Sequence, residues 1–499
     1  MPVPNSLRCL VRPSTGLPVS IPRTAASLGV PSAGLLGTPL LAAASFSTTS
    51  SRSEGASGIA KNHHRGGKKT FTVKKKAFVL ERGKSPLPGE RKAYRKRIIL
   101  SNDNALAVPW LTDLGPAELS NENNVARVMG IPEEVQDQLR ASEAFKTTQC
   151  WRMFRKPAVL VRKETVDLTR RMDRAAQNNE MLRLVVTGDK VAGKSLMLLQ
   201  AMTHAFLNDW VVIHIPEAQE LTTACTEYAP IPNTDPLQYM QPVYALKLIQ
   251  AIKKANEKVL SKTFTRNAHP HLPQNIPANT PLLTLANVAK ESEAAWPVFQ
   301  SLWAELTAQG VARPPILLSI DGLAHMMKIS DYRTPAFDLI HSHDLALVRL
   351  FANAFGGGLK LPAGGAVIGA TSRSNAPRCP SLELAVSRRE VEQRIEASSK
   401  AAGSGSGAET TATATEEVPQ RDPYFRGYDD RVEAVLRSVE VLRVGAIDKN
   451  EARAVMEYWA ASGMFRSVVD TKTVTEKWTL GGNGVLGEME RASLLSMRM

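Results

Sequence analysis

The chain has 499 residues, which is too many for one compact core, so two or three folded units are expected. Hydrophobic residues make up 43% of the chain and charged residues 22%, ordinary values for a soluble globular protein. No apolar stretch approaches the roughly 18 residues of a membrane-spanning helix, so membrane insertion is not expected. The four cysteines lie far apart without a CxxC pair, which argues against a disulfide scaffold and a cysteine-based zinc site.

The net charge of +14 is concentrated at the N-terminus. Residues 1–100 contain 18 lysines and arginines but three acids, whereas the rest of the chain contains 44 bases and 45 acids. A near-neutral body behind a basic N-terminal segment indicates targeting, polyanion binding, or both.

Residues 1–53 have the composition of an organellar transit peptide. They contain four arginines, no acid, and many Ser, Thr, Ala, Leu and Pro residues. A secretory signal would place positive charge before one compact apolar core, but here the apolar patch at 35–46 comes late and is interrupted by Gly37 and Pro39. We predict mitochondrial import, with cleavage between residues 44 and 57. A tail without a targeting role is the alternative.

Residues 54–130 are predicted to be a basic arm followed by an irregular extension. Between residues 61 and 97 the chain carries 14 bases and two acids, and self-repulsion favours an extended, disordered state. Bases placed on phosphates release counterions, so the arm is expected to bind RNA without reading its sequence. Phe71, Phe78 and Tyr94 are interleaved and suited to stacking on unpaired bases. A solvated solubility tail is the alternative.

Residues 131–396 are predicted to form an α/β domain. Apolar runs typical of buried strands occur at 181–188, 210–215, 316–320 and 366–371. Helical patterns lie around them, at 133–145, 163–177, 194–208, 242–260, 284–309 and 337–355. Strands that alternate with helices predict a parallel sheet covered on both faces.

Three further segments surround or interrupt this domain. The proline-rich stretch at 265–281 is expected to be a surface loop, either ordered or mobile. Residues 397–419 have the composition of a low-complexity linker. Residues 420–499, with helical patterns at 430–442, 449–462 and 486–495, predict a small, mainly helical C-terminal unit.

A phosphate-binding loop is predicted at residues 188–195, which fit GxxxxGK[ST] at every fixed position. The loop follows a predicted strand and opens a predicted helix, as such a loop must. Lys194 is suited to reach the β- and γ-phosphates, and the Ser195 hydroxyl is suited to ligate Mg²⁺. The predicted nucleotide-binding residues are Gly188, Asp189, Lys190, Val191, Ala192, Gly193, Lys194 and Ser195.

The acid that completes such a site is predicted at Asp321. It ends the apolar run 316–320, and its carboxylate is expected to hold Mg²⁺ through water, opposite Ser195. An aspartate at a plain turn is the alternative reading, especially with Gly322 behind it.

Other features limit the expected chemistry. Gly322 stands where many hydrolytic P-loop ATPases carry a water-activating glutamate, and no guanine-reading NKxD motif is present. A predicted strand ends in Thr371-Ser372-Arg373, where related folds carry a polar residue near the γ-phosphate. The site is therefore expected to hold a nucleotide better than to hydrolyse it, and the protein is at most a slow GTPase with no assignable catalytic residue.

Paired histidines at 341 and 343 and at 269 and 271 are not expected to bind metal. The first pair lies in a helical pattern, where positions i and i+2 point apart. The second lies in the proline-rich loop with no acidic or cysteine partner close in sequence.

These residues together resemble the death-associated protein 3 family. The resemblance rests on the loop at 188–195, the segments 210–219, 226–230 and 239–244, and the strand that ends at Asp321. It covers residues 130–390 well and the C-terminal unit loosely, and it is closest to the fungal form. The 397–418 segment has no counterpart in the family pattern.

The resemblance implies an AAA-like P-loop NTPase fold. It implies a GTP-binding protein of the mitochondrial small ribosomal subunit, in contact with ribosomal RNA, neighbouring small-subunit proteins and, across the interface, the large subunit. GTP or GDP with Mg²⁺ is the implied ligand, and ATP is not excluded. Gly188, Gly193, Lys194 and Ser195 match the family's phosphate loop, and Asp321 its magnesium-side acid.

The sequence therefore predicts a structural, nucleotide-binding ribosomal protein in the mitochondrial matrix. A free mitochondrial AAA-type ATPase that remodels other proteins is the alternative. It predicts a water-activating acid beside Asp321, which is absent, and an arginine finger, which is not identifiable. A switch-type GTPase would carry an NKxD motif, and this sequence has none, so that class is not supported.

Overall fold

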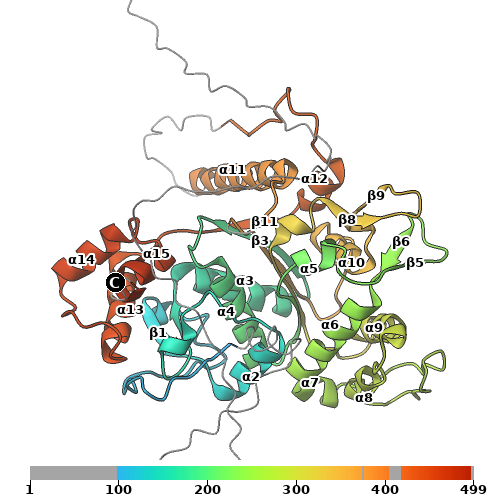
Figure 1. Cartoon of the computed structure of the whole chain (residues 1–499), viewed down its shortest axis with the longest axis horizontal. Helices are drawn as coiled ribbons and strands as arrows, with labels where there is room; N and C mark the ends of the chain where they lie inside the picture. Colours follow the sequence, from blue (N-terminus) through green and yellow to red (C-terminus); the bar gives the residue numbers. More distant parts are fainter. Residues whose placement is uncertain (1–97, 374–375, 404–416, 496–499) are drawn as a thin grey trace, which may run out of the picture. The chain divides into compact units, whose positions relative to one another are not determined.

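The computed structural model describes residues 98–373, 376–403 and 417–495. The predicted leader and the basic arm at 61–97 lie outside these ranges, as does most of the predicted linker. The described part forms one unit built around a five-stranded sheet (Figure 1).

All adjacent strands of the central sheet run parallel, as the alternation of strands and helices predicted. The strand order is β11-β3-β10-β7-β4. Every residue of β4, β7 and β10 is buried, which explains why these strands appear in the sequence as continuous apolar runs. The strands are β3 (Met181–Gly188), β4 (Val211–Ile215), β7 (Ile316–Asp321), β10 (Gly365–Ala370) and β11 (Glu440–Val444).

Helices cover both faces of this sheet. On one face lie α2 (Glu133–Ala141), α3 (Lys163–Gln177) and α4 (Lys194–Leu207), whose apolar side chains share a core with alternate residues of the strands. On the other face lie α6 (Pro242–Ala255), α9 (Ser292–Leu306) and α10 (Ala346–Phe355). The sheet is thus the middle layer of three, as in other α/β domains.

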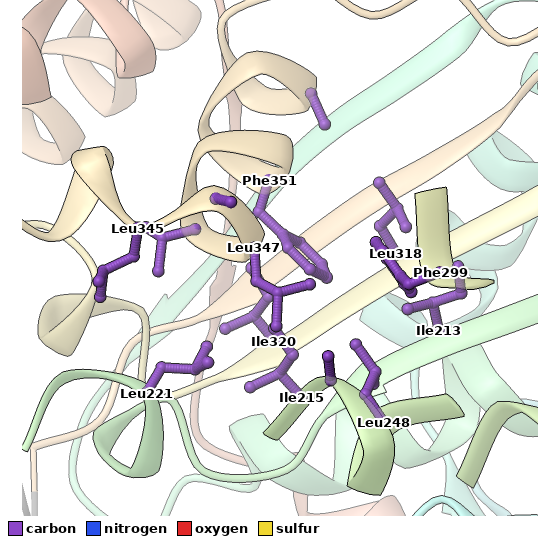
Figure 2. Packing of buried hydrophobic residues seen from close by; sticks show 14 of the residues in the cluster. Ile213, Ile215, Leu221, Leu248, Phe299, Leu318, Ile320, Leu345, Leu347 and Phe351 are labelled. Atoms are coloured by element: carbon purple, nitrogen blue, oxygen red, sulfur yellow. The ribbon is translucent and has the colours of Figure 1, made fainter. Parts of the chain in front are cut away.

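Figure 2 shows how the second face is packed. Ile213 of β4 and Ile320 of β7 point into the same layer and meet side chains from the covering helices, all of them at most 3% exposed. Val212, next to Ile213, and Leu317, three positions before Ile320, belong to the core on the opposite face, because successive side chains of a strand point to opposite sides. The helical side chains in this layer include Leu248, Phe299, Leu347 and Phe351.

Shorter elements complete the unit. Three small antiparallel pairs are formed by β1 (Arg127–Gly130) with β2 (Ala158–Val161), β5 (Ala229–Ile231) with β6 (Gln238–Met240), and β8 (Ile329–Arg333) with β9 (Leu339–His341). The remaining α-helices before the C-terminal segment are α5 (Gln219–Thr222), α7 (Glu257–Lys262), α8 (Leu282–Asn287), α11 (Pro380–Gly403) and α12 (Asp430–Leu436).

The segment after β11, residues 445–495, is mainly helical and packs on the first small sheet. It contains α13 (Lys449–Ala461), α14 (Thr471–Leu480) and α15 (Leu486–Glu490), which share a third core with residues of β1 and β2. Within the described ranges, no helix combines the length and the apolarity needed to cross a membrane.

Several predicted elements were wrong in detail. The helix predicted at 242–260 is divided into α6 and α7, and the helix predicted at 284–309 into α8 and α9. The helix predicted at 430–442 ends at Leu436 and is followed by β11, which extends the central sheet beside β3. The helix predicted at 337–355 contains β9 and a 3₁₀ turn before α10 begins. The predicted linker begins as helix, because α11 continues to Gly403. Short apolar runs fit either a strand or a helix, and only their neighbours decide between the two.

Candidate nucleotide site

The phosphate-loop sequence forms the turn between β3, which ends at Gly188, and α4, which begins at Lys194. Gly193 has φ +105°, a left-handed conformation that favours glycine. A Cβ atom on Gly188 would lie 2.4 Å from the carbonyl oxygen of Val444 in β11. Glycine is therefore required at both fixed positions, once for backbone conformation and once for space.

The Lys194 side chain lies across the loop and is 7% exposed. Its Nζ donates hydrogen bonds to the carbonyl oxygens of Gly188, at 3.0 Å, and Asp189, at 2.6 Å. Burial, and then the nearby Arg373 charge, lowers the pKa of Lys194, although Asp189 and Asp321 oppose the shift. The ammonium is thus held where a phosphate chain in the loop would meet it.

Ser195 and Asp321 are brought together by the topology of the sheet. Asp321 ends β7, which is separated from β3 by β10, so both residues lie at the carboxyl edge of the sheet. The Ser195 Oγ donates a hydrogen bond of 2.8 Å to Asp321 Oδ2. The Ser195 hydroxyl, at the first turn of α4, and the Asp321 carboxylate, at the end of β7, are oxygen ligands of the kind that Mg²⁺ prefers. These residues therefore fit that ion.

A lysine that sequence reasoning missed shares this carboxylate. Lys146 Nζ lies 3.2 Å from Asp321 Oδ2 and also donates to the carbonyl oxygen of Pro216. Close by, His214 makes a 3.0 Å contact with Ser319 Oγ, and burial, with a contribution from Lys146, lowers its pKa to about 3. His214 is therefore neutral, whereas Lys146 brings a positive charge. Lys146 belongs to no motif, so nothing in the sequence singles it out.

A buried arginine, also missed, ties the loop to the end of β11. Arg162 is 4% exposed, and its Nη1 donates to the carbonyl oxygen of Ala192 at 3.2 Å. Its Nη2 donates to Gly445 O at 2.9 Å and to Glu164 Oε1 at 3.0 Å. The guanidinium thus fixes the loop against a strand that lies more than 250 positions away in the sequence.

A cavity of about 380 Å³ opens beside the loop. Its loop side is lined by Lys190, Val191, Gly193, Lys194 and Ser195, together with Asp321. The loop residues Gly188, Asp189 and Ala192 do not line it. The far wall is largely apolar and includes Trp151, Phe154, Tyr458, Trp459 and Leu486.

The C-terminal helices complete this cavity. The Gly487 backbone N–H in α15 donates to Val191 O at 3.1 Å, and a Cβ atom on Gly487 would lie 2.8 Å from the Val191 Cβ. The volume is within the range of small-molecule sites. The site thus has a polar floor for an anion and an apolar wall for a flat ring, and the sequence did not predict that the C-terminal segment would supply part of that wall.

Comparison with known proteins agrees with this architecture. Residues 159–492 match the family described as mitochondrial ribosomal death-associated protein 3, and they include the whole phosphate loop, Asp321 and α15. The chain belongs to this family. Membership confirms the predicted resemblance and the predicted mitochondrial location.

Individual relatives share one protein name but match this chain over different lengths. The small ribosomal subunit protein mS29 of Neurospora crassa is 55% identical over the full length of both chains. The mS29 proteins of Mus musculus and Bos taurus are 28% and 27% identical over 22% of this chain, which corresponds to 28% and 27% of their own lengths. The full-length match is thus to a fungal form of the family, which agrees with the predicted likeness to that form and extends it beyond residues 130–390.

A more distant likeness was found among solved structures. A Walker-type ATPase of Pyrococcus abyssi matches with 14% identity and a TM-score of 0.30, over 65% of this chain and 66% of its own. At this TM-score the likeness supports no conclusion about this protein.

The three polar residues that directly follow β10 lie at the cavity. Thr371 donates from its hydroxyl to Val186 O at 3.2 Å, so its side chain is held by β3. Arg373 is 62% exposed, and its Nη1 lies 3.9 Å from Asp189 Oδ1. Thr371, Ser372 and Arg373 all line the cavity, and Arg373 brings a positive charge next to the loop.

Gly322, directly after Asp321, has a structural reason to be glycine. Its φ is +81°, in the left-handed region, and its N–H donates to Ala370 O at 3.1 Å. A glutamate at this position would be strained by about 1–2 kcal/mol. The backbone thus disfavours a water-activating acid where hydrolytic relatives of this fold carry one.

The histidine pairs lie differently from what the sequence indicated. His341 ends β9, and its ring centroid lies 4.6 Å from that of His343, so the two side chains do not point apart. His269 Nε2 lies 3.1 Å from Glu305 Oε1, so an acidic partner does exist, contributed by α9. Within the described part of the chain, no group of three or more His, Cys, Asp or Glu side chains is placed to hold a metal ion.

Proposed function

We propose that the protein is a structural constituent of the small subunit of the mitochondrial ribosome, and that it binds a purine nucleotide, GTP or GDP, with Mg²⁺. The ribosomal part is supported by the fungal mS29 relative, which matches over its whole length at 55% identity. The nucleotide part rests on one observation: the buried Lys194 ammonium and the Ser195–Asp321 pair face a single cavity beside a glycine-shaped loop.

Different residues of the site would bind different parts of the nucleotide. Backbone N–H groups of the loop and the N-terminus of α4 would hold the phosphates, assisted by the Lys194 ammonium. Ser195, and Asp321 through water, would hold Mg²⁺, whose charge neutralises the phosphates. The apolar wall with Trp151 and Phe154 is suited to the flat face of a purine ring.

The nucleotide is proposed to act as a structural ligand. Gly322 occupies the position of a water-activating acid, and its left-handed backbone keeps it a glycine. Turnover by the purified protein is therefore expected to be very slow. A ligand that stays bound stabilises the folded state that it binds.

Sedimentation tests the ribosomal role. Tagged protein from mitochondrial extracts is expected to co-migrate with the small subunit in a density gradient, and nucleotide released from those fractions by denaturation is expected to be a purine di- or triphosphate. A free AAA-type ATPase would sediment apart from the subunit, and that result would contradict the proposal.

The basic arm at 61–97 gives a second prediction, which concerns RNA. Deleting the arm is expected to weaken association with small-subunit ribosomal RNA and to make log K fall less steeply with log salt, because fewer phosphate contacts release counterions. Binding is measured over a range of salt concentrations for both proteins. An unchanged slope would mean that the charge of the arm is merely solvated.

A further inference from the structure

The magnesium side of the site already contains a positive charge. Lys146 Nζ lies 3.2 Å from Asp321 Oδ2, the same oxygen that accepts the hydrogen bond from Ser195 Oγ. The Lys146 and Asp321 side chains are 21% and 10% exposed, so solvent screens their attraction only in part. The carboxylate expected to hold Mg²⁺ is thus paired with the protein's own cation.

The lysine is held in this position by a second contact. Its Nζ also donates to the carbonyl oxygen of Pro216, which directly follows β4. The backbone N–H of Lys146 donates to Gln149 Oε1 at 2.8 Å, which fixes the start of the side chain as well. Both ends of Lys146 are therefore anchored, and the ammonium is directed at Asp321.

We propose that Lys146 competes with Mg²⁺ for Asp321, so that the metal adds little to the affinity of the site for its nucleotide. The inference rests on the proposed nucleotide binding and concerns the Asp321 carboxylate, which Lys146 contacts and which lines the cavity. A carboxylate that must give up an ammonium to bind Mg²⁺ binds the ion more weakly than a free carboxylate would. The Lys146 ammonium beside the carboxylate also repels a divalent ion held there.

The role differs from that of Lys194, which lies on the loop. Lys194 Nζ contacts loop carbonyl oxygens and would meet the phosphates, whereas Lys146 contacts Asp321 from the segment after α2. Removing the Lys146 charge is expected to leave Asp321 uncompensated and to increase its attraction for Mg²⁺. Nucleotide binding would then come to depend on the metal.

Affinity for a fluorescent GDP analogue, measured with excess Mg²⁺ and with EDTA, tests this inference on the full chain. For the wild type, we expect EDTA to weaken binding less than about threefold. For Lys146→Met and Lys146→Gln, we expect EDTA to weaken binding at least about tenfold, equivalent to about 1.4 kcal/mol. Both variants remove the charge and keep an unbranched side chain, and Lys146→Arg, which keeps the charge, is expected to behave like the wild type.

A readout without nucleotide supports the same test. Mg²⁺ alone is expected to raise the melting temperature of Lys146→Gln more than that of the wild type, because the freed carboxylate binds the ion. Lys163→Gln is the matched control, since Lys163 pairs with Asp448 at 2.8 Å on the surface, where the two side chains are 71% and 63% exposed. It should leave the effect of Mg²⁺ unchanged.

Two results would overturn the role of Lys146. One is a wild type that loses tenfold or more of its affinity in EDTA. The other is a pair of charge-removing variants with the same response to Mg²⁺ as the wild type. A wild type that binds no GDP, GTP or ATP, with or without Mg²⁺, would instead overturn the proposed nucleotide binding itself, and the role of Lys146 with it.

Discussion

Replacing Lys194 with alanine is expected to lower nucleotide affinity roughly 10- to 150-fold, because a charge-assisted contact to phosphate is worth about 1.5–3 kcal/mol. The ammonium lies within the loop, where it bonds to Gly188 O and Asp189 O, so it is already placed to meet the ligand. Titration of the purified variant with GDP measures the loss.

The same substitution should lower thermal stability more when nucleotide is present than when it is absent. At saturating ligand, a hundredfold weaker Kd removes about 2.7 kcal/mol of the stabilisation that binding gives the folded state. Melting is therefore measured with and without GDP, and incorporation into small subunits is followed in parallel. Lys258→Ala, an exposed lysine of α7 that pairs with Asp209 at 3.1 Å, serves as the control. A Lys194→Ala protein that melts and assembles like the wild type, or rapid GTP turnover by the wild type, would contradict a structural nucleotide.

The largest loss of stability is expected from Glu305→Gln. Glu305 of α9 and Arg313 are each 1% exposed in their side chains and form an ion pair of 2.8 Å. The glutamine keeps the shape but leaves the Arg313 charge buried without a counter-charge, which is expected to lower the free energy of unfolding by about 3–5 kcal/mol. Denaturant titration measures the change. Asp137→Asn, which breaks an exposed pair with Arg140, is the control and should cost less than about 1 kcal/mol.

The effect of Glu305→Gln should depend on pH. Burial raises the pKa of Glu305, but the backbone N–H groups of Arg266 and Asn267, the His269 ring and Arg313 together lower it below its usual range. A lowered pKa in the folded state contributes stability above the unfolded pKa of about 4.3, and this stability is lost as the pH falls through the folded pKa. The difference between wild type and variant should therefore be full at neutral pH and shrink in acid. A variant with wild-type stability at neutral pH would contradict this account of the pair.

Glu305 also decides the state of the proline-rich segment, which the sequence left open between an ordered and a mobile loop. The carboxylate accepts hydrogen bonds from the N–H groups of Arg266, at 2.7 Å, and Asn267, at 2.9 Å. Arg313 Nη1 donates to Phe264 O at 2.7 Å. The loop is therefore ordered by charges buried beneath it. The number of prolines in the segment does not predict this order.

The sequence by itself determined the parallel sheet, the glycine-shaped loop between β3 and α4, and the position of Asp321 at the end of β7. Buried parallel strands are continuous apolar runs, so β3, β4, β7 and β10 could be predicted within one residue or two of their ends. The loop could be located because close backbone approach to phosphates requires glycine at fixed spacing, and Gly188 and Gly193 have this spacing. Both the apolar runs and the glycine spacing depend on residues that are close in sequence, so the sequence is enough to predict them.

Only the tertiary structure decided what surrounds the loop. Lys146 reaches Asp321, Arg162 reaches Ala192 and Gly445, and Gly487 meets Val191, in each case across a long separation in sequence. β11 was mistaken for part of a helix because its short apolar run becomes a strand only beside β3. A single lysine, a single arginine or a short apolar run has no fixed spacing by which a sequence pattern could identify it. Their roles come from partners that the chain brings close only after it has folded.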